Sequence, residues 1–347
     1  MVPSREIPIK VLIAGGCLLV FCLAAVLGGV VAAGSFYSPL DRPVSPGGLS
    51  IQPTLALPAP LILTQTASPT LPPPAPLGPQ GKIVYDCQVF AIQAEDQICL
   101  INADGSGQRR LTTEDEVRHF YPSFSPDGKS VLFSSNFTGN FEIYELTLDG
   151  GQLSRVGGTV GIAPEASPDN HYVVFTRSDG QHTDTIWVMD RFGLNPHEVY
   201  NNGWDPTWSP DGSRILFATM QNDKSQLATI SPDGSGLHIV TALPSLRGRS
   251  DWSADGLHLI TYSGPAWGRE LYIMDADGSH LRQVGPPGGD SQGPSFSPDG
   301  QWIAFTAYFD HPHSINGCEI YIMRIDGSDL KRLTDNNYCD WQPRWGP

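Results

Sequence analysis

A short serine segment flanked by glycines is the first candidate for chemistry. Gly289-Asp290-Ser291-Gln292-Gly293 matches the Gly-x-Ser-x-Gly pattern of serine hydrolases, which expose the serine between a strand and a helix. Here the segment runs directly into Pro294-Ser295-Phe296, which begins a predicted strand, and no α/β segment supplies a partner Asp and His. We therefore interpret it as a connecting loop and predict no catalytic residue.

Two further segments carry the residue types that bind metals. Asp310, His311 and His313 lie in the longest insertion, and His with carboxylate can ligate zinc, but Pro312 restricts how the two rings converge. Asp275-Ala276-Asp277-Gly278 resembles the start of a calcium loop without its later oxygen ligands and Glu. We expect a solvated loop and a hairpin turn, and predict no metal and no cofactor.

The amino-acid composition indicates which kind of secondary structure carries these loops. The 347 residues carry 21 Lys+Arg against 36 Asp+Glu, a net charge of -15, which argues against a nucleic-acid partner. Charged residues are only 16%, with 37 Gly and 31 Pro. This composition disfavours helical bundles and favours many short strands joined by turns.

A repeated motif organises the chain from residue 81 onward. Its pattern is Pro-x-aromatic-Ser-Pro-Asp-Gly, and its copies begin at Pro122, Pro164, Pro206, Ser250 and Pro294, with a truncated copy at Pro343. The aromatic position recurs at intervals of 42, 42, 44, 44 and 49 residues. Periods of this size are typical of propellers and solenoids.

Each repeat predicts four strands. One ends at the aromatic residue, and Ser-Pro-Asp-Gly then forms a tight turn into an apolar strand such as Val131-Leu132-Phe133. A third strand, usually an Asp-Gly hairpin and a more polar fourth strand follow. The fold class is therefore all-β, a six-bladed propeller in which a C-terminal strand (341–345) completes the N-terminal blade (82–87, 97–103 and 108–112).

These repeats resemble those of the TolB-type six-bladed β-propeller over about residues 81–347. The resemblance implies a propeller that binds partners in the Tol–Pal envelope system. TolB-type proteins carry an α/β domain ahead of the propeller. This chain has an apolar segment and a Pro-rich segment in that place.

The first eighty residues predict a membrane tether. Residues 11–34 are uncharged, mostly apolar and long enough to span a bilayer, and Arg5 and Lys10 precede them. We predict a cytoplasmic tail (1–10), a transmembrane signal-anchor helix (11–34), a Pro-rich disordered stalk (35–80) and an extracytoplasmic propeller (81–347). The alternative is a signal peptide cleaved near Val31-Ala32-Ala33, which gives a secreted protein.

Four cysteines lie beyond the apolar segment, and four cysteines allow three pairings. Cys87 and Cys99 flank one strand–loop–strand unit, while Cys318 and Cys339 flank the last strand pair. We predict the disulfides Cys87–Cys99 and Cys318–Cys339.

Binding is expected on the face formed by the connections of variable length. That face offers aromatic residues and three arginines of a type enriched in binding hot spots. The arginines predict a cationic patch for a carboxylate or an acidic partner. The aromatic residues are Tyr121, Trp204, Trp267, Tyr308, Phe309, Tyr338 and Trp341, and the arginines are Arg247, Arg249 and Arg269.

We therefore predict a membrane-tethered recognition or scaffold module, with a monomeric propeller that binds an envelope protein, peptide or glycan without catalysis. One alternative is a metal-assisted hydrolase or lyase that uses the central axis. Another is a sensor whose stalk couples binding to a membrane partner.

Overall fold

The computed structural model describes residues 78–89, 95–114, 116–178, 184–243, 246, 248–314 and 317–347. The predicted tail, the apolar segment and nearly all of the Pro-rich segment lie outside these residues, as does Arg247. Within the described ranges, no helix is both long and apolar enough to cross a membrane.

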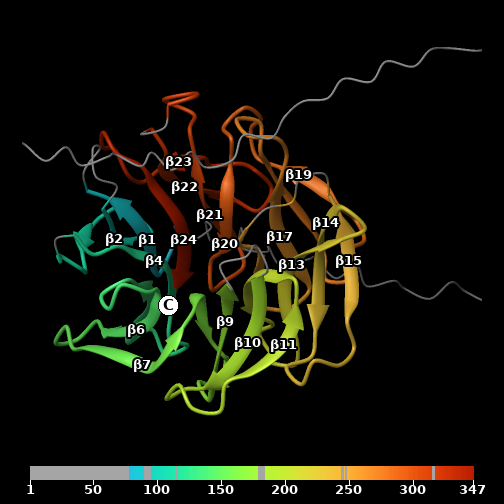
Figure 1. Ribbon diagram of the computed structural model, residues 1–347. Helices are drawn as coiled ribbons and strands as arrows, with labels where there is room; N and C mark the ends of the chain where they lie inside the picture. Colours follow the sequence, from blue (N-terminus) through green and yellow to red (C-terminus); the bar gives the residue numbers. More distant parts are fainter. Residues whose placement is uncertain are drawn as a thin grey trace, which may run out of the picture. The chain divides into compact units, whose positions relative to one another are not determined.

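The described residues form six four-stranded antiparallel sheets, arranged as blades around an axis (Figure 1). We number the blades in chain order. Blade 1 contains β4 (His119–Phe124), β5 (Ser130–Ser135), β6 (Glu142–Thr147) and β7 (Leu153–Val160). Blade 2 contains β8 (Ile162–Ala166), β9 (Tyr172–Ser178), β10 (Asp184–Asp190) and β11 (His197–Asn201). Blade 3 contains β12 (Gly203–Trp208), β13 (Ile215–Gln221), β14 (Lys224–Ile230) and β15 (His238–Ala242). Blade 4 contains β16 (Asp251–Trp252), β17 (His258–Ser263), β18 (Glu270–Asp275) and β19 (Arg282–Val284). Blade 5 contains β20 (Gln292–Phe296), β21 (Trp302–Ala307), β22 (Glu319–Arg324) and β23 (Lys331–Arg332).

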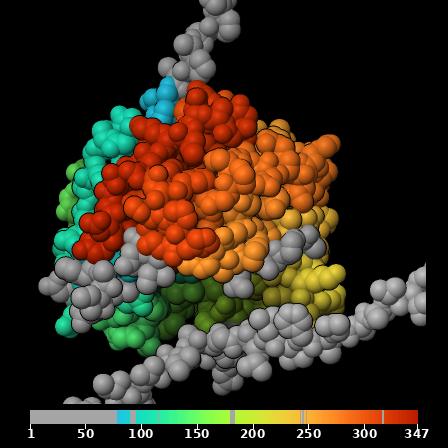
Figure 2. Space-filling view, turned by 90° about the horizontal axis from the view of Figure 1, so that it is seen from above, coloured from blue at the N-terminus to red at the C-terminus, as the bar shows by residue number. Residues whose placement is uncertain are grey.

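Blade 6 combines strands from both ends of the described chain. Its strand order is β24 (Asp340–Gly346), β1 (Lys82–Gln88), β2 (Asp96–Asn102) and β3 (Arg109–Arg110). β24 pairs antiparallel with β1, with Trp345 opposite Ile83. In the space-filling view, residues near the start of the described chain (cyan) and residues near its end (red) form one continuous surface (Figure 2).

The core lies between neighbouring blades, because the second strand of each blade is apolar on both faces. Val131, Leu132 and Phe133 of β5 are completely buried, for example. Each blade-to-blade interface holds its own cluster of buried side chains. One cluster packs Ile83 and Trp345 of blade 6 against Trp302 of blade 5. Such sandwiched strands explain the near-continuous apolar runs in the sequence.

The Ser-Pro-Asp-Gly turns are fixed by their own side chains. In blade 3, the Ser209 hydroxyl donates to Asp211 Oδ1 at 2.6 Å and accepts the Arg214 backbone N–H at 2.9 Å. The same pair of bonds recurs at Ser167 and at Ser297. The recurring Ser and Asp thus hold the tight turn that the motif predicted.

Both predicted disulfides are present. Cys87–Cys99 links β1 to β2, with the two Cα atoms 5.8 Å apart. Cys318–Cys339 links the residue before β22 to the residue before β24, with a Cα separation of 4.6 Å. The second bridge therefore joins blade 5 to the loop that leads into blade 6.

Candidate functional site

The propeller has two faces with different loops. The Ser-Pro-Asp-Gly turns and the hairpins between third and fourth strands lie at one face, which we call the turn face. The remaining connections, including residues 264–269, 285–291 and 308–314, lie at the other, which we call the variable-loop face. The innermost strands β4, β8, β12, β16, β20 and β24 run between the two faces around the axis.

A bulge in five of the innermost strands shapes the axis. In each, the residue before the motif proline has a positive φ, and the pairing with the second strand is shifted at this point. A bulge of this kind re-aims a side chain. The residues at this position differ from blade to blade, namely Tyr121, Ala163, Asp205, Gly293 and Gln342, with Arg249 at the equivalent place in blade 4.

Two arginines reach across the axis to blades that are not their neighbours. Arg344 of blade 6 lies 3.4 Å from Glu165 of blade 2 and 3.3 Å from Asp251 of blade 4. Arg249 of blade 4 donates to the carbonyl oxygen of Pro122 in blade 1, at 2.9 Å. Contacts of this reach require both guanidinium groups to lie near the centre of the ring.

The carboxylates around Arg344 hold neighbouring blades together. Glu165 accepts the Thr207 hydroxyl at 2.6 Å and the Trp208 backbone N–H at 2.9 Å. Asp251 does the same for Ser295 and the Phe296 backbone, at 2.8 and 2.9 Å. Because both carboxylates are engaged by the next blade, this layer is structural.

The layer around Arg249 is buried and electrostatically unusual. Burial raises the pKa of Asp205 to about 6, and burial with the nearby Asp96 raises the pKa of Asp86 well above its ordinary value. Burial and the nearby Arg344 lower the pKa of Arg249 to about 10. Glu165, Asp205 and Asp86 act electrostatically in the opposite direction and favour the charged form of Arg249.

Gly248 makes room for this arrangement. Its φ is +67°, and a Cβ at this position would collide with the Tyr262 hydroxyl and press against Asp205 Oδ2 at 3.2 Å. Only glycine combines this backbone conformation with such a close approach.

A pocket of about 200 Å³ opens at the variable-loop end of the axis, which we call the channel-mouth pocket. Its lining includes Arg249, Tyr308, Trp341 and Gln342. Nε and Nη2 of Arg249, Nε1 of Trp341 and Oε1 of Gln342 are buried without a hydrogen-bond partner among the described residues. Unmade buried hydrogen bonds are costly, so four polar atoms that line one pocket and lack partners among the described residues indicate a place for a polar ligand.

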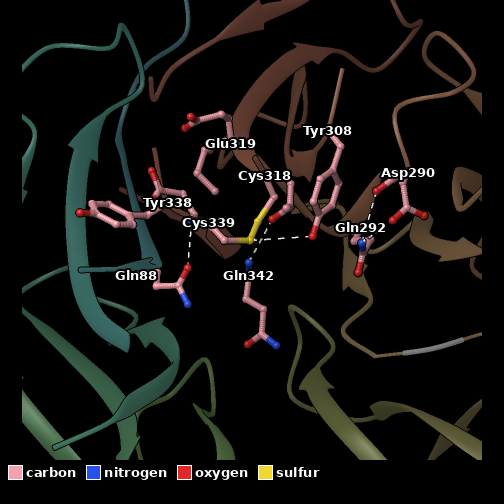
Figure 3. Close-up of a disulfide and its surroundings, with 12 residues drawn as sticks. Gln88, Asp290, Gln292, Tyr308, Cys318, Glu319, Tyr338, Cys339 and Gln342 are labelled. Carbon is pink, nitrogen blue, oxygen red and sulfur yellow. Dashed lines mark hydrogen bonds between the residues drawn. A yellow bond between two sulfur atoms is a disulfide. The ribbon is translucent and has the colours of Figure 1, made fainter. Parts of the chain in front are cut away.

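Figure 3 shows the wall of this pocket beside the second disulfide. The Tyr308 hydroxyl points at the Cys339 sulfur, 3.8 Å away, and Gln292 and Gln342 lie close by on β20 and β24. Next to this wall, the Trp267 ring packs edge-on against Tyr308 at 5.3 Å and in a tilted arrangement against His313 at 5.5 Å. Trp267 is 38% exposed, so an aromatic surface adjoins the pocket.

The other predicted binding residues divide between packing and ion pairing. Trp204 packs onto the cluster between blades 3 and 4, and Phe309 lies edge-on to Phe305 and Tyr321 in blade 5. Arg269 forms a 3.1 Å ion pair with Asp290.

The predicted surface patch of three arginines is therefore wrong in two respects. Arg249 is only 2% exposed and belongs to the axis, and the charge of Arg269 is already paired. Its place in a loop of the sequence suggested that Arg249 is exposed, but the ring arrangement of the blades encloses it at the axis. The residue before each motif proline varies from blade to blade. This variation is the sequence signal that could have indicated the channel-mouth pocket.

The Gly-x-Ser-x-Gly segment and the insertion that contains Asp310 and His313 lie at connections between strands. Residues 289–291 lead directly into β20, which contains Gln292 and Gly293, and no helix follows. Ser291 is buried and donates its backbone N–H to the Arg269 carbonyl. His313 packs against Trp267, and Asp310 accepts bonds from Tyr321 and Arg332. The described residues hold no group of three or more His, Cys, Asp or Glu side chains arranged to bind a metal.

Comparison with known proteins agrees with this architecture. The family described as the TolB beta propeller domain matches residues 78–249. The chain contains a TolB-like six-bladed β-propeller. The crystal structure of TolB from Acinetobacter baumannii matches it with a TM-score of 0.68 and 23% identity, over 78% of this chain and 68% of that one.

Two curated relatives are similar to part of this TolB-like chain. An uncharacterized protein of Agrobacterium fabrum is 30% identical over 194 residues, 53% of this chain and 62% of that protein. The Tol-Pal system protein TolB of Bordetella pertussis is 32% identical over 141 residues, 40% of this chain and 32% of TolB. The chain thus spans less than two thirds of the length of these relatives.

Proposed function

We propose that this TolB-like propeller is a non-catalytic protein-interaction module of the cell envelope, which holds its partner on the variable-loop face. The observation that carries the proposal is the channel-mouth pocket, where buried donors and an acceptor have no partner within the described part of the chain and an exposed aromatic surface lies beside them. The similarity to a protein of the Tol-Pal system supports an envelope role.

The pocket favours a neutral polar group over a carboxylate. Arg249 and Trp341 offer donors, while Gln342 offers an acceptor. Glu165 and Asp205 already act electrostatically on Arg249, so its charge does not require an anionic ligand. A peptide group or a side-chain amide supplies both an acceptor and a donor, and a pocket of this size accommodates one such group.

We further propose that residues 11–34 tether the propeller to the membrane, with residues 35–80 as the stalk and the propeller on the extracytoplasmic side. The apolar run, the preceding basic residues and the Pro-rich segment support this arrangement. Two disulfides in the propeller favour an oxidising compartment.

Photo-crosslinking in cells tests the binding face. A photoreactive residue at position 267, at the channel mouth, is expected to form adducts with an envelope protein. The same residue at position 192 is the control, because Phe192 is 79% exposed in the β10–β11 hairpin of the turn face. Gln342→Ala should reduce the adduct at 267 several-fold. Equal adducts at both positions, or none at 267, would reject the proposed face.

Fractionation of the same cells tests the tether. The full-length chain should remain in the membrane fraction after a high-salt wash. A version in which a cleavable signal replaces residues 1–34 should be released in soluble form. Release of the unmodified chain would instead support the cleaved signal peptide.

A further inference from the structure

A second concave site lies on the turn face, between blades 2 and 3. Its volume is about 570 Å³, within the range of ligand pockets. Val188 of β10 and Trp208 of β12 are buried at its base. Tyr172 of β9, Pro168 and Pro232 add apolar surface at its sides. We call it the inter-blade groove.

Tyr172 distinguishes this groove from the equivalent places in blades 1, 3 and 5. It is 47% exposed, although it occupies the position just after a Ser-Pro-Asp-Gly-type turn. Blade 1 has the buried Ser130 there, and blade 5 has Trp302, which is covered by the Arg324 guanidinium 4.4 Å from its ring. In blade 3, Arg214 takes this position and donates to the Gly236 carbonyl at 2.6 Å. An aromatic ring is thus left open beside an apolar base in blade 2.

The rim of the groove is acidic. Asp169, Asp211 and Asp233 line it, and no Lys or Arg is among its lining residues. Hydrogen bonds from the turn serines hold the pKa of each of these carboxyls below its ordinary value, so all three are anionic at neutral pH. The basic groups nearby are His197, His171 and Arg214, and the Arg214 guanidinium is hydrogen-bonded to the Gly236 carbonyl. His197 lies 3.4 Å from the Pro232 carbonyl, and His171 lies 3.1 Å from Asp169.

We propose that the inter-blade groove binds a cationic peptide segment of a partner protein. An apolar side chain of that segment packs between Tyr172 and Trp208, and flanking Lys or Arg side chains face the carboxylates at the rim. Charge complementarity favours a cationic segment, because an acidic segment would be repelled by the three carboxylates at the rim. The groove faces away from the channel-mouth pocket, so the propeller would contact two partners at once.

The test compares two synthetic probes binding to the purified full-length protein. The peptides Arg-Pro-Leu-Pro-Arg and Glu-Pro-Leu-Pro-Glu, both capped and fluorescently labelled, differ only in charge. The cationic probe should bind with a Kd below about 1 mM, and its affinity should fall as salt is raised. The acidic probe should bind at least tenfold more weakly. Absence of cationic binding at 1 mM, or equal binding of the two probes, overturns the proposal.

Matched variants locate the binding. Tyr172→Ser, which introduces the residue of blade 1, should weaken the cationic probe at least tenfold, and Tyr172→Phe should retain it. Asp233→Asn keeps a hydrogen-bond acceptor for the turn. It should lower the affinity for the cationic probe and make that affinity less dependent on salt. Trp267→Ala at the channel mouth should leave probe binding unchanged, which separates this site from the proposed function. Unaltered binding by Tyr172→Ser, in a variant whose thermal unfolding matches wild type, would refute the site.

Discussion

The Asp residues of this propeller fall into two classes: exposed ones that recur in the turns, and enclosed ones that do not recur. The Asp of each Ser-Pro-Asp-Gly turn is exposed and hydrogen-bonded, which lowers the pKa of Asp127, Asp169, Asp211 and Asp255. Asp86, Asp205 and Asp340 are enclosed, and their pKa values rise. The repeated Asp therefore serves the fold as a charged group, while the non-repeated ones sit where charge is disfavoured.

Asp340 gives a prediction for the pH dependence of stability. Burial, with the nearby Glu319, raises its pKa to about 8, while the same carboxyl in the unfolded chain ionises near its ordinary value of 3.8. Between these pH values the folded state holds a proton that the unfolded state releases, so rising pH destabilises the fold. The free energy of unfolding of wild type relative to Asp340→Asn should therefore fall between pH 5 and pH 8, by up to about 1.4 kcal/mol per pH unit.

Urea unfolding of both proteins at several pH values measures this difference. Asn336 donates to Asp340 Oδ2 at 2.8 Å, and an Asn side chain oriented with its oxygen there keeps that bond. Asp211→Asn, on a turn, is the control: the pKa of Asp211 is lowered, so its carboxyl is ionised in both the folded and unfolded states between pH 5 and pH 8, and the difference should not vary with pH. Parallel pH profiles for wild type and Asp340→Asn would contradict the assigned burial effect.

At the scale of elements, most of the fold was predictable because its signals are local. Turn chemistry and apolar runs in the sequence predicted four strands per repeat. The predicted strand 97–103 corresponds to β2, Asp96–Asn102. The predicted outermost strand 108–112 is shorter in the structure, where β3 is only Arg109–Arg110. Outer strands have one paired edge and an exposed face, so their hydrophobic pattern carries little information about length.

The candidate site was harder to predict because it depends on contacts between distant blades. Tyr308 and Trp267 were predicted at the variable-loop face, and they lie together beside the channel mouth. Arg249 was predicted at the surface, yet it spans the axis to Pro122. No local pattern shows that residues 127 positions apart will meet. The ring arrangement of the blades brings them together.

β24 supplies a prediction about how one element supports the ring. Trp345 is 8% exposed, donates its indole N–H to the Gln80 carbonyl at 2.8 Å and packs with Ile83 and Trp302. Trp345→Ala leaves a large cavity between blades 5 and 6. We expect it to lower the free energy of unfolding by about 3–5 kcal/mol, measured by urea denaturation.

Phe192→Ala serves as the control for Trp345→Ala. Its ring is 79% exposed, so the change in stability should stay within about 0.5 kcal/mol. A similar small effect for Trp345→Ala would mean that the pairing of β24 with β1 contributes little to the stability of the ring.

For the whole molecule, both ends of the described chain meet in blade 6, and the disulfides are placed around that meeting point. Cys87–Cys99 spans 12 residues within blade 6, whereas Cys318–Cys339 spans 21 residues and connects blade 5 to the segment before β24. Around the bridges, the Asp340 N–H donates to the Cys318 carbonyl and the Gln88 N–H donates to the Cys339 carbonyl. The second bridge therefore restrains the segment on which the pairing of β24 and β1 depends.

Removing either disulfide alone should lower the free energy of unfolding by a similar amount, but only one of the two removals should speed amide exchange in β24. In the loop-entropy description, each pair of Cys→Ser substitutions should lower the free energy of unfolding by about 3 kcal/mol. The Cys318→Ser, Cys339→Ser protein should also exchange the backbone amides of β24 faster, because the loop before that strand is freed from blade 5. The Cys87→Ser, Cys99→Ser protein should keep slow exchange in β24, since its bridge lies between β1 and β2. Hydrogen exchange read by mass spectrometry distinguishes the two. Equal protection of β24 in both proteins would show that strand pairing and the Trp345 contacts hold this end of the ring without the bridge to blade 5.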